Sequence, residues 1–234
     1  MRSACGSGAW RWASLAVAAG VLACTGGQRP GATPVPARAM LFQPDAAFWR
    51  EEAPAKFQVR IETTRGPFTL ALTRALAPVG VDHFYNLVRA GYYDDSRFSR
   101  TVAGWITQFG IAGDPAVSAV WASRPIRDDS VRASNVRGSV IFAMTGPDTR
   151  TTQVVINRRD NLGQDAQGFA PLGYVVQGMD VVDSLYSGYG ERSGGGMRAG
   201  RQHQVLTEGN AYLDREFPRL DHLIRARVVE PPER

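Results

Sequence analysis

The sequence is poor in cysteine and histidine. Its two cysteines, Cys5 and Cys24, lie near the N-terminus, which excludes a disulfide framework or a cysteine-based metal site in the rest of the chain. The three histidines, His83, His203 and His222, are scattered, and none shares a ligand motif with a carboxylate. A metal-dependent hydrolase is therefore not supported, and we expect no metal and no cofactor.

Clusters of like charge are also lacking. The chain carries 27 Lys and Arg against 22 Asp and Glu, for a formal net charge of +5, and the two signs are interspersed. No basic run marks a nucleic-acid-binding surface, so we expect no nucleic acid partner. Hydrophobic residues make up 44% of the 234 positions. This content supports a real core, and the length suits one domain with extensions.

The only long apolar run lies near the N-terminus. Arg2 and Arg11 provide a positively charged start, and residues 13–23 are almost wholly apolar. This run has the length of the apolar part of a signal peptide and is too short to cross a bilayer as a helix. We therefore expect residues 1–23 to be a signal peptide.

The apolar run ends in Val21-Leu22-Ala23-Cys24, which resembles the lipobox of bacterial lipoproteins. The resemblance implies that Cys24 is acylated, becomes the first mature residue and anchors the protein to a membrane. The residue after Cys24 is Thr25 and not Asp. In lipoproteins of Gram-negative bacteria, this resemblance implies sorting to the outer membrane. We therefore expect the protein to be located in the cell envelope, anchored by lipid to the periplasmic face of a membrane. An ordinary secretory signal with an incidental cysteine is the alternative.

Composition and periodicity predict the order of the next elements. Residues 24–54 are typical of a flexible tether, with a short helix at 45–52. Residues 57–64 alternate apolar and polar side chains, and with residues 67–73 they predict a β-hairpin. A helix is expected over residues 79–90. Its apolar face would consist of Val81, Phe84, Tyr85 and Val88.

Residues 97–110 combine strand-forming apolar residues with one cation and one amide. Alternate residues of a strand share a face, so Phe98 would lie beside Arg100. In the same way Ile106 would lie beside Gln108 on a second piece of strand. Two interpretations follow from this pattern. One is a core strand with a surface arginine, and the other is a shallow apolar pocket with a guanidinium and an amide at its edge.

This stretch also resembles the signature F-x-R-x-x-x-G-[FW]-x-x-Q-x-G of cyclophilin-type peptidyl-prolyl isomerases. The matching residues are Phe98, Arg100, Gly104, Trp105, Gln108 and Gly110. A second family segment is matched by Gly146, Pro147, Asp148, Thr149, Thr152, Gln153 and Ile156. A third match runs over residues 172–182, and the resemblance as a whole covers about residues 56–188.

The resemblance implies a mostly β fold, a closed eight-stranded antiparallel barrel capped by two helices. We expect the isomerase domain at residues 55–190, followed by a helical extension at residues 191–234 that packs on the barrel. Residues 193–196 would be a flexible joint, and residues 221–229 a last helical turn or an edge strand. A partner-binding role for the extension is the alternative.

The resemblance also implies the site. Arg100 would be catalytic, and Gln108 would hold it and meet the substrate backbone. The substrate-binding residues would be Phe98, Trp105, Ile106, Ala143, Met144, Gln153, Val155, Leu162 and Phe169.

Several positions depart from the family's pattern. Val155 stands where a pocket-floor Phe is usual, Met144 replaces Asn and Ser99 replaces His. Phe169 falls where a pocket His is usual, while Trp105 in place of Phe would partly refill the space. We expect a reshaped pocket with slower turnover.

Two other groups of polar residues are predicted to be solvated. These are His83 and the segment 114–135, which contains the pair Asp128-Asp129.

The leading hypothesis is a monomeric, lipid-anchored prolyl isomerase acting on Xaa-Pro segments of envelope proteins as they fold. A non-enzymatic module that binds proline-containing segments as a chaperone or scaffold is the alternative.

Overall fold

One antiparallel β-sheet is the centre of the fold in the part of the chain that the computed structural model describes, residues 37–197 and 201–229. The predicted signal peptide, Cys24 and residues 24–36 of the predicted tether lie outside these residues. The strands are β1 (Lys56–Thr63), β2 (Gly66–Thr73), β3 (Ser96–Arg97), β4 (Arg100–Val102), β5 (Ile106–Phe109), β6 (Ser139–Phe142), β7 (Val154–Asn157), β8 (Gly173–Gln177) and β9 (His222–Val229).

The predicted hairpin is confirmed as β1 and β2. The two strands pair in register from Lys56↔Thr73 to Thr63↔Gly66. Gly66 has φ +117°, a value that L side chains rarely adopt, and so makes the tight turn. Alternate residues of β1 are buried, as the apolar-polar alternation predicted. They anchor one side of the main core.

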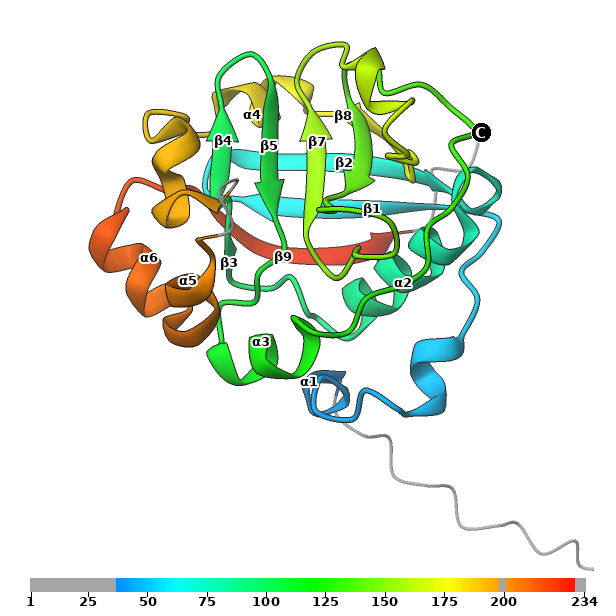
Figure 1. Cartoon of the computed structure of the whole chain (residues 1–234), viewed down its shortest axis with the longest axis horizontal. Coiled ribbons are helices and arrows are strands. Elements are labelled where there is room, and N and C mark those ends of the chain that lie inside the picture. Colours follow the sequence, from blue (N-terminus) through cyan, green and yellow to red (C-terminus); the bar gives the residue numbers. More distant parts are fainter. Residues whose placement is uncertain (1–36, 198–200, 230–234) are drawn as a thin grey trace, which may run out of the picture. The chain divides into compact units, whose positions relative to one another are not determined.

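The strands form one antiparallel sheet in the order β3-β9-β1-β2-β8-β6-β7-β5-β4. Figure 1 shows the sheet curling, so that β4, β5 and β7 run in front of and across β1, β2 and β9. The predicted mostly β antiparallel class is confirmed. The detail of a closed eight-stranded barrel differs, because the described residues contain nine strands, with β3 and β4 at the two ends of the order.

The ninth strand comes from the segment expected to pack on the barrel from outside. β9 lies inside the sheet between β3 and β1, and is neither a helical turn nor an edge strand. Leu223 and Ala226 are buried in the core. Arg225 pairs with Glu62 on the exposed face, where its Nε lies 2.8 Å from the carboxylate. A strand was one of the two alternatives predicted here, but its position inside the sheet was not predicted.

Ten short or medium helices flank the sheet in the described part of the chain. They are α1 (Ala37–Met40), η1 (Ala47–Arg50), η2 (Arg74–Leu76), α2 (Pro78–Arg89), α3 (Pro115–Trp121), η3 (Leu162–Gln164), α4 (Met179–Ser184), η4 (Gly190–Gly195), α5 (His203–Glu208) and α6 (Asn210–Glu216), where η denotes a 3-10 helix. The predicted helix at 79–90 is α2, and it buries Val81, Phe84 and Val88. Helix α3 corrects the prediction of a solvated loop over 114–135, because Trp121 is buried and donates from Nε1 to the Leu41 carbonyl at 2.9 Å.

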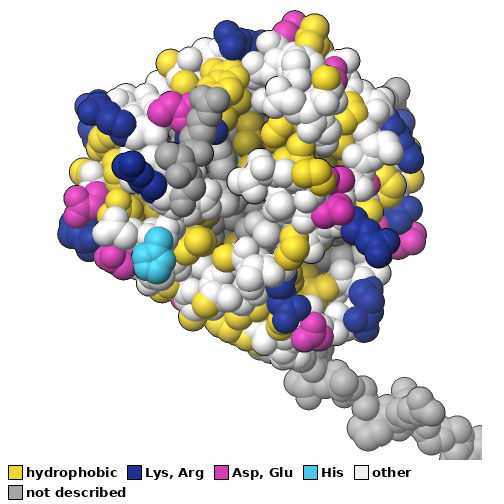
Figure 2. All heavy atoms as spheres, in the orientation of Figure 1, with side chains coloured by type: hydrophobic (Ala, Val, Ile, Leu, Met, Phe, Trp, Pro, Cys, Tyr) yellow, Lys and Arg dark blue, Asp and Glu magenta, His cyan; other side chains and the backbone are white. Residues whose placement is uncertain are grey.

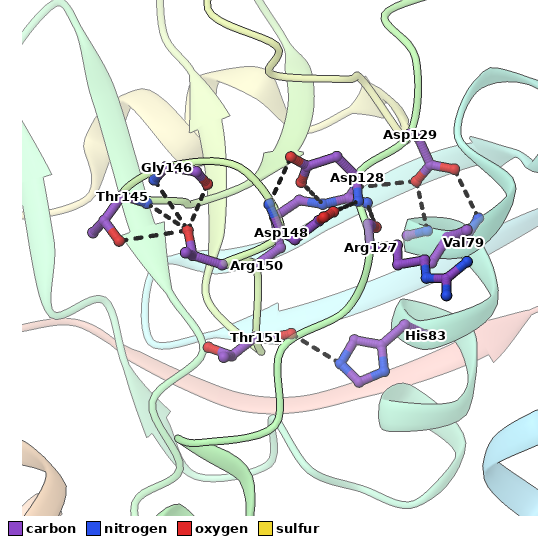
Figure 3. Close-up of polar contacts among 12 residues, drawn as sticks. Val79, His83, Arg127, Asp128, Asp129, Thr145, Gly146, Asp148, Arg150 and Thr151 are labelled. Atoms are coloured by element: carbon purple, nitrogen blue, oxygen red, sulfur yellow. Dashed lines mark hydrogen bonds and ion pairs between the residues drawn. The ribbon is translucent and has the colours of Figure 1, made fainter.

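The pair Asp128-Asp129 belongs to an ion-pair network around the buried Arg150 and not to a solvated loop. Asp129 accepts hydrogen bonds from the backbone N–H groups of Val79 (2.9 Å) and Gly80 (2.8 Å) at the start of α2. It also pairs with Arg150 at 3.0 Å, and both side chains are only 3% exposed. Figure 3 shows how Arg150 lies between the two aspartates and the loop that carries Thr145 and Gly146. The acids therefore fix α2 and the loop between β6 and β7.

No helix among residues 37–197 and 201–229 is long and apolar enough to cross a membrane.

Candidate active site

The β4–β5 hairpin places Arg100 and Gln108 side by side. The two residues are direct cross-strand partners, so their side chains leave the same face of the sheet. The Arg100 guanidinium donates from Nη1 to the Gln108 Oε1 at 3.1 Å. Their neighbours Thr101 and Thr107 point to the opposite face, where their hydroxyls lie 2.7 Å apart. Gly104, at φ +62°, makes the turn that brings the strands together.

A chain of amide side chains continues from this pair. Gln108 donates from Nε2 to the Gln153 Oε1 at 2.8 Å, and Gln153 donates in turn to the Gln202 Oε1 at 2.9 Å. An amide whose oxygen accepts one of these hydrogen bonds has its orientation fixed, because its oxygen and nitrogen can no longer exchange places. The chain links β4, β5, the start of β7 and the residue before α5 in one polar wall.

The Arg100 side chain is largely enclosed, with 8% of its surface exposed. Its Cζ lies 5.1 Å from the centroid of the Trp105 ring, within range of a cation–π interaction. Its Nε and Nη2 face the carboxylate of Glu191, at 2.9 Å and 2.8 Å. The guanidinium is thus held on one side by an amide, on another by a carboxylate and on a third by an indole ring.

An apolar cluster adjoins this polar wall. Ile106, Ile141 and Val155 are buried against one another, and the partly buried Trp105 and Phe169 pack against them. The cluster forms the floor of a groove of about 740 Å³. Figure 2 shows this face of the molecule, with hydrophobic side chains gathered in a hollowed region between polar surfaces.

Most of the predicted site residues line this one groove. They are Arg100, Trp105, Ile106, Gln108, Ala143, Met144, Gln153, Val155, Leu162 and Phe169. Leu162 lies on the rim, where it is 55% exposed. The backbone thus brings residues from β4 through η3 around a single concavity, as the second interpretation of residues 97–110 required.

Phe98 is the exception, and its predicted role in substrate binding is wrong. Its side chain is 1% exposed in the main core, and its ring packs edge-to-face on Phe109 with centroids 5.5 Å apart. β3 ends at Arg97 and β4 begins at Arg100. Strand alternation therefore does not run through Phe98, and the residue faces away from the groove.

His83 is likewise not the solvated histidine that its position off the helix face suggested. It is partly buried, and its Nε2 donates to the carbonyl of Thr151 at 2.9 Å. Thr151 lines the groove. Burial, with a smaller contribution from the nearby Arg150 cation, lowers the pKa of His83 to about 4, although the hydrogen bond to Thr151 opposes this shift. The imidazole is therefore neutral at pH 7, and it supports the groove wall as a hydrogen-bond donor (Figure 3).

Sequence patterns missed four residues of the site. Ile141 lies two positions before Ala143 on β6 and lines the floor, so strand periodicity would have identified it. Met197 and Gln202 line the groove from the C-terminal extension. Glu191 reaches Arg100 from 91 residues away in the sequence. No local pattern signals a contact at that separation.

The groove combines hydrogen-bond donors in its polar wall with an apolar floor. None of the described residues lining the groove is a histidine or cysteine, and Asp160 is the only carboxylate among them. Within residues 37–197 and 201–229, no cluster of three potential metal ligands occurs. The chemistry available here is binding of an apolar ring with directed hydrogen bonds from a fixed cation.

Comparisons with known proteins agree with this geometry. Residues 58–205 match the family model described as cyclophilin type peptidyl-prolyl cis-trans isomerase/CLD. The chain is 34% identical to peptidyl-prolyl cis-trans isomerase A of Dickeya dadantii over 54% of this chain and 70% of that protein. It is 30% identical to peptidyl-prolyl cis-trans isomerase B of Escherichia coli over 58% of this chain and 88% of that protein.

Solved structures share the fold. A cyclophilin-type peptidyl-prolyl cis-trans isomerase from Cryptosporidium parvum superposes with a TM-score of 0.53 at 18% identity, covering 76% of this chain and 99% of that one. The same protein was also crystallised in the presence of the dipeptide Ala-Pro, and that structure gives a TM-score of 0.51 at 18% identity over 74% and 99% of the chains. The chain belongs to the cyclophilin-type peptidyl-prolyl cis-trans isomerases, and it is an enzyme of that class.

Proposed function

We propose that Arg100 catalyses rotation about Xaa-Pro bonds by stabilising the twisted amide. The barrier to rotation, about 18–20 kcal/mol, comes from C–N resonance. The two isomers of an Xaa-Pro bond differ by only about 0.5–1 kcal/mol, so the slow step is rotation alone. In the twisted state the prolyl nitrogen regains a lone pair, which a fixed guanidinium N–H stabilises more than it stabilises the planar amide.

The observation that carries this proposal is the position of Arg100 at the edge of an apolar floor. A proline ring seated on Ile106, Ile141 and Val155 would put its nitrogen beside the cation. Arg100 donates one N–H each from Nε, Nη1 and Nη2 to its protein partners. Arginine has five N–H donors, so two remain to face a substrate. Arginine also keeps its charge at every working pH.

Replacing Arg100 tests this role. Arg100→Ala is expected to lower kcat/KM for isomerisation of an Ala-Pro peptide by about a hundred- to a thousandfold, the cost of one preorganised donor. The matched control is Arg60→Ala, which removes an arginine that is 49% exposed on β1, outside the groove. The control should keep the wild-type rate. Equal rates for Arg100→Ala and wild type would refute the catalytic role.

The proposed substrates are Xaa-Pro segments of exported proteins that fold in the cell envelope. Support comes from the groove, from the Ala-Pro dipeptide used with a relative, and from the lipobox-like residues 21–24. A diacylated Cys24 would hold the isomerase at the membrane where such proteins fold, because two acyl chains anchor stably where one is marginal.

The anchor is tested with Cys24→Ser. In a bacterial host the wild-type protein should partition with membranes and carry an acylated N-terminal Cys24 by mass spectrometry. The variant should remain unacylated and be released with the water-soluble fraction on lysis. An unacylated wild-type protein cleaved at another position would favour the ordinary secretory signal.

A further inference from the structure

The catalytic arginine is held by a residue of the C-terminal extension. Glu191, on the 3-10 helix η4, takes two hydrogen bonds from Arg100 in a fork, Nε to Oε2 at 2.9 Å and Nη2 to Oε1 at 2.8 Å. The guanidinium side chain is 8% exposed, while the Glu191 side chain is 41% exposed. Paired parallel bonds of this kind fix the plane of a guanidinium as well as its position.

The helix that carries Glu191 is itself anchored beside β4. Ser193 is 1% exposed, and its Oγ donates to the carbonyl of Ser99 at 2.6 Å, one residue before Arg100. Gly194 has φ +61°, and a side chain there would meet Met197. These packed positions correct the prediction of a flexible joint at residues 193–196. Glu191 is therefore presented to Arg100 by ordered backbone.

We propose that Glu191 is a positioning residue for Arg100, an inference that rests on the catalytic role proposed for that arginine. Gln108 holds only Nη1. Without Glu191 the guanidinium keeps only this one hydrogen bond and its contact with the Trp105 ring, 5.1 Å from its Cζ, so it can turn about its long, flexible stem. The fork from Glu191 removes this freedom, and two N–H groups of the fixed guanidinium remain for a substrate. Misplacement of a catalytic group by about 1 Å costs up to about a hundredfold in rate.

A carboxylate next to a catalytic cation also has an opposing effect, since it reduces the positive potential at the prolyl nitrogen. Two features make that effect the smaller one. The nitrogen of a twisted amide carries only part of a unit charge, and the exposed Glu191 side chain is screened by water. Orientation therefore outweighs neutralisation, and removal of the carboxylate should slow the enzyme.

The test uses Glu191→Gln in the full chain. Glutamine keeps the shape but is uncharged and has one acceptor oxygen, so it cannot offer a separate oxygen to each of the two N–H groups. The matched control is Glu208→Gln on α5, a carboxylate that is 40% exposed, pairs with Arg215 at 3.1 Å and lies outside the groove. We expect Glu191→Gln to lower kcat/KM for an Ala-Pro peptide about tenfold, with the peptide Kd and the unfolding temperature within error of the control.

A double variant separates positioning from a general structural effect. If Glu191 acts through Arg100, then Glu191→Gln should have no further effect on the residual activity of Arg100→Ala. An unchanged or faster rate for Glu191→Gln, with Arg100→Ala inactive, would overturn this inference and leave the catalytic role of Arg100 intact. A tenfold loss that persists in the Arg100→Ala background would also overturn it. Full activity of Arg100→Ala would refute both.

Discussion

At the scale of single residues, the groove is defined by how its apolar floor is filled. Val155, where the family's pattern has Phe, is 5% exposed and packs with Ile106 and Ile141. Two aromatic side chains, Trp105 and Phe169, pack against this cluster. These departures are scattered in the sequence but meet at one cluster, and that they compensate one another in volume remains a prediction.

Phe169 should contribute to binding more than to turnover. Its ring can contact a bound proline equally in the planar and twisted states, and such uniform binding lowers KM without raising kcat. Phe169→Ala is expected to raise KM for an Ala-Pro peptide roughly tenfold, about 1.4 kcal/mol, with kcat within about twofold of wild type. The control is Phe42→Ala, at a phenylalanine that is 47% exposed. A large loss of kcat at unchanged KM would contradict this role.

His83 should make stability depend on pH. Its pKa is about 4 in the folded state, against an ordinary value of 6.5 for a solvated imidazole. The unfolded chain therefore takes up a proton before the folded protein does as the pH falls. The stability that this group contributes is fully present above pH 6.5 and is lost as the pH falls toward 4. Between pH 7 and pH 5 the loss amounts to about 2 kcal/mol.

Urea unfolding of wild type and His83→Gln at the two pH values measures this contribution. Glutamine can still donate to the Thr151 carbonyl but does not titrate. The difference in unfolding free energy between the two proteins should shift by about 2 kcal/mol in favour of the variant on going from pH 7 to pH 5. Parallel pH dependence of the two proteins would show that the imidazole is not held neutral.

At the scale of elements, locally patterned segments were predictable and distant pairings were not. The β1–β2 hairpin and α2 follow from alternation and from a helical apolar face, which a short window of sequence contains. Helix α3 is only seven residues long and lies in a polar segment. Strand β9 pairs with β1, which precedes it by more than 150 residues. The position of such a strand is determined by tertiary contacts and not by its local sequence.

The insertion of β9 into the sheet gives a stability prediction. Leu223 is fully buried between Thr63 and Ser96 of the neighbouring strands, whereas the next residue, Ile224, is 51% exposed. Leu223→Ala should lower the free energy of unfolding by about 2–5 kcal/mol, from lost burial and the cavity left behind. Ile224→Ala, the control on the same strand, should cost less than about 1 kcal/mol. Equal small effects in urea unfolding would mean that β9 packs only loosely.

At the scale of the whole molecule, the C-terminal extension is part of both the sheet and the active site. It supplies β9, and it supplies Glu191 and Gln202 to the polar wall of the groove. The Arg100–Gln108 pair was predictable from the resemblance to the family signature, which contains both residues, and the two form a hydrogen bond across one hairpin. Their partners from the extension were not, since the contacts form only when the sheet has curled. The boundary between domain and extension remains a prediction.

The central claim is that Arg100 stabilises the twisted amide of the transition state and contributes little to binding of the planar peptide. It is tested most directly by magnetisation-exchange NMR, which measures cis–trans exchange of an Ala-Pro peptide while it is bound. With Arg100→Ala we expect a peptide Kd within about threefold of wild type, and bound-state exchange slowed at least about a hundredfold. Wild-type exchange on the variant would contradict the claim. So would a loss of activity explained entirely by weaker binding.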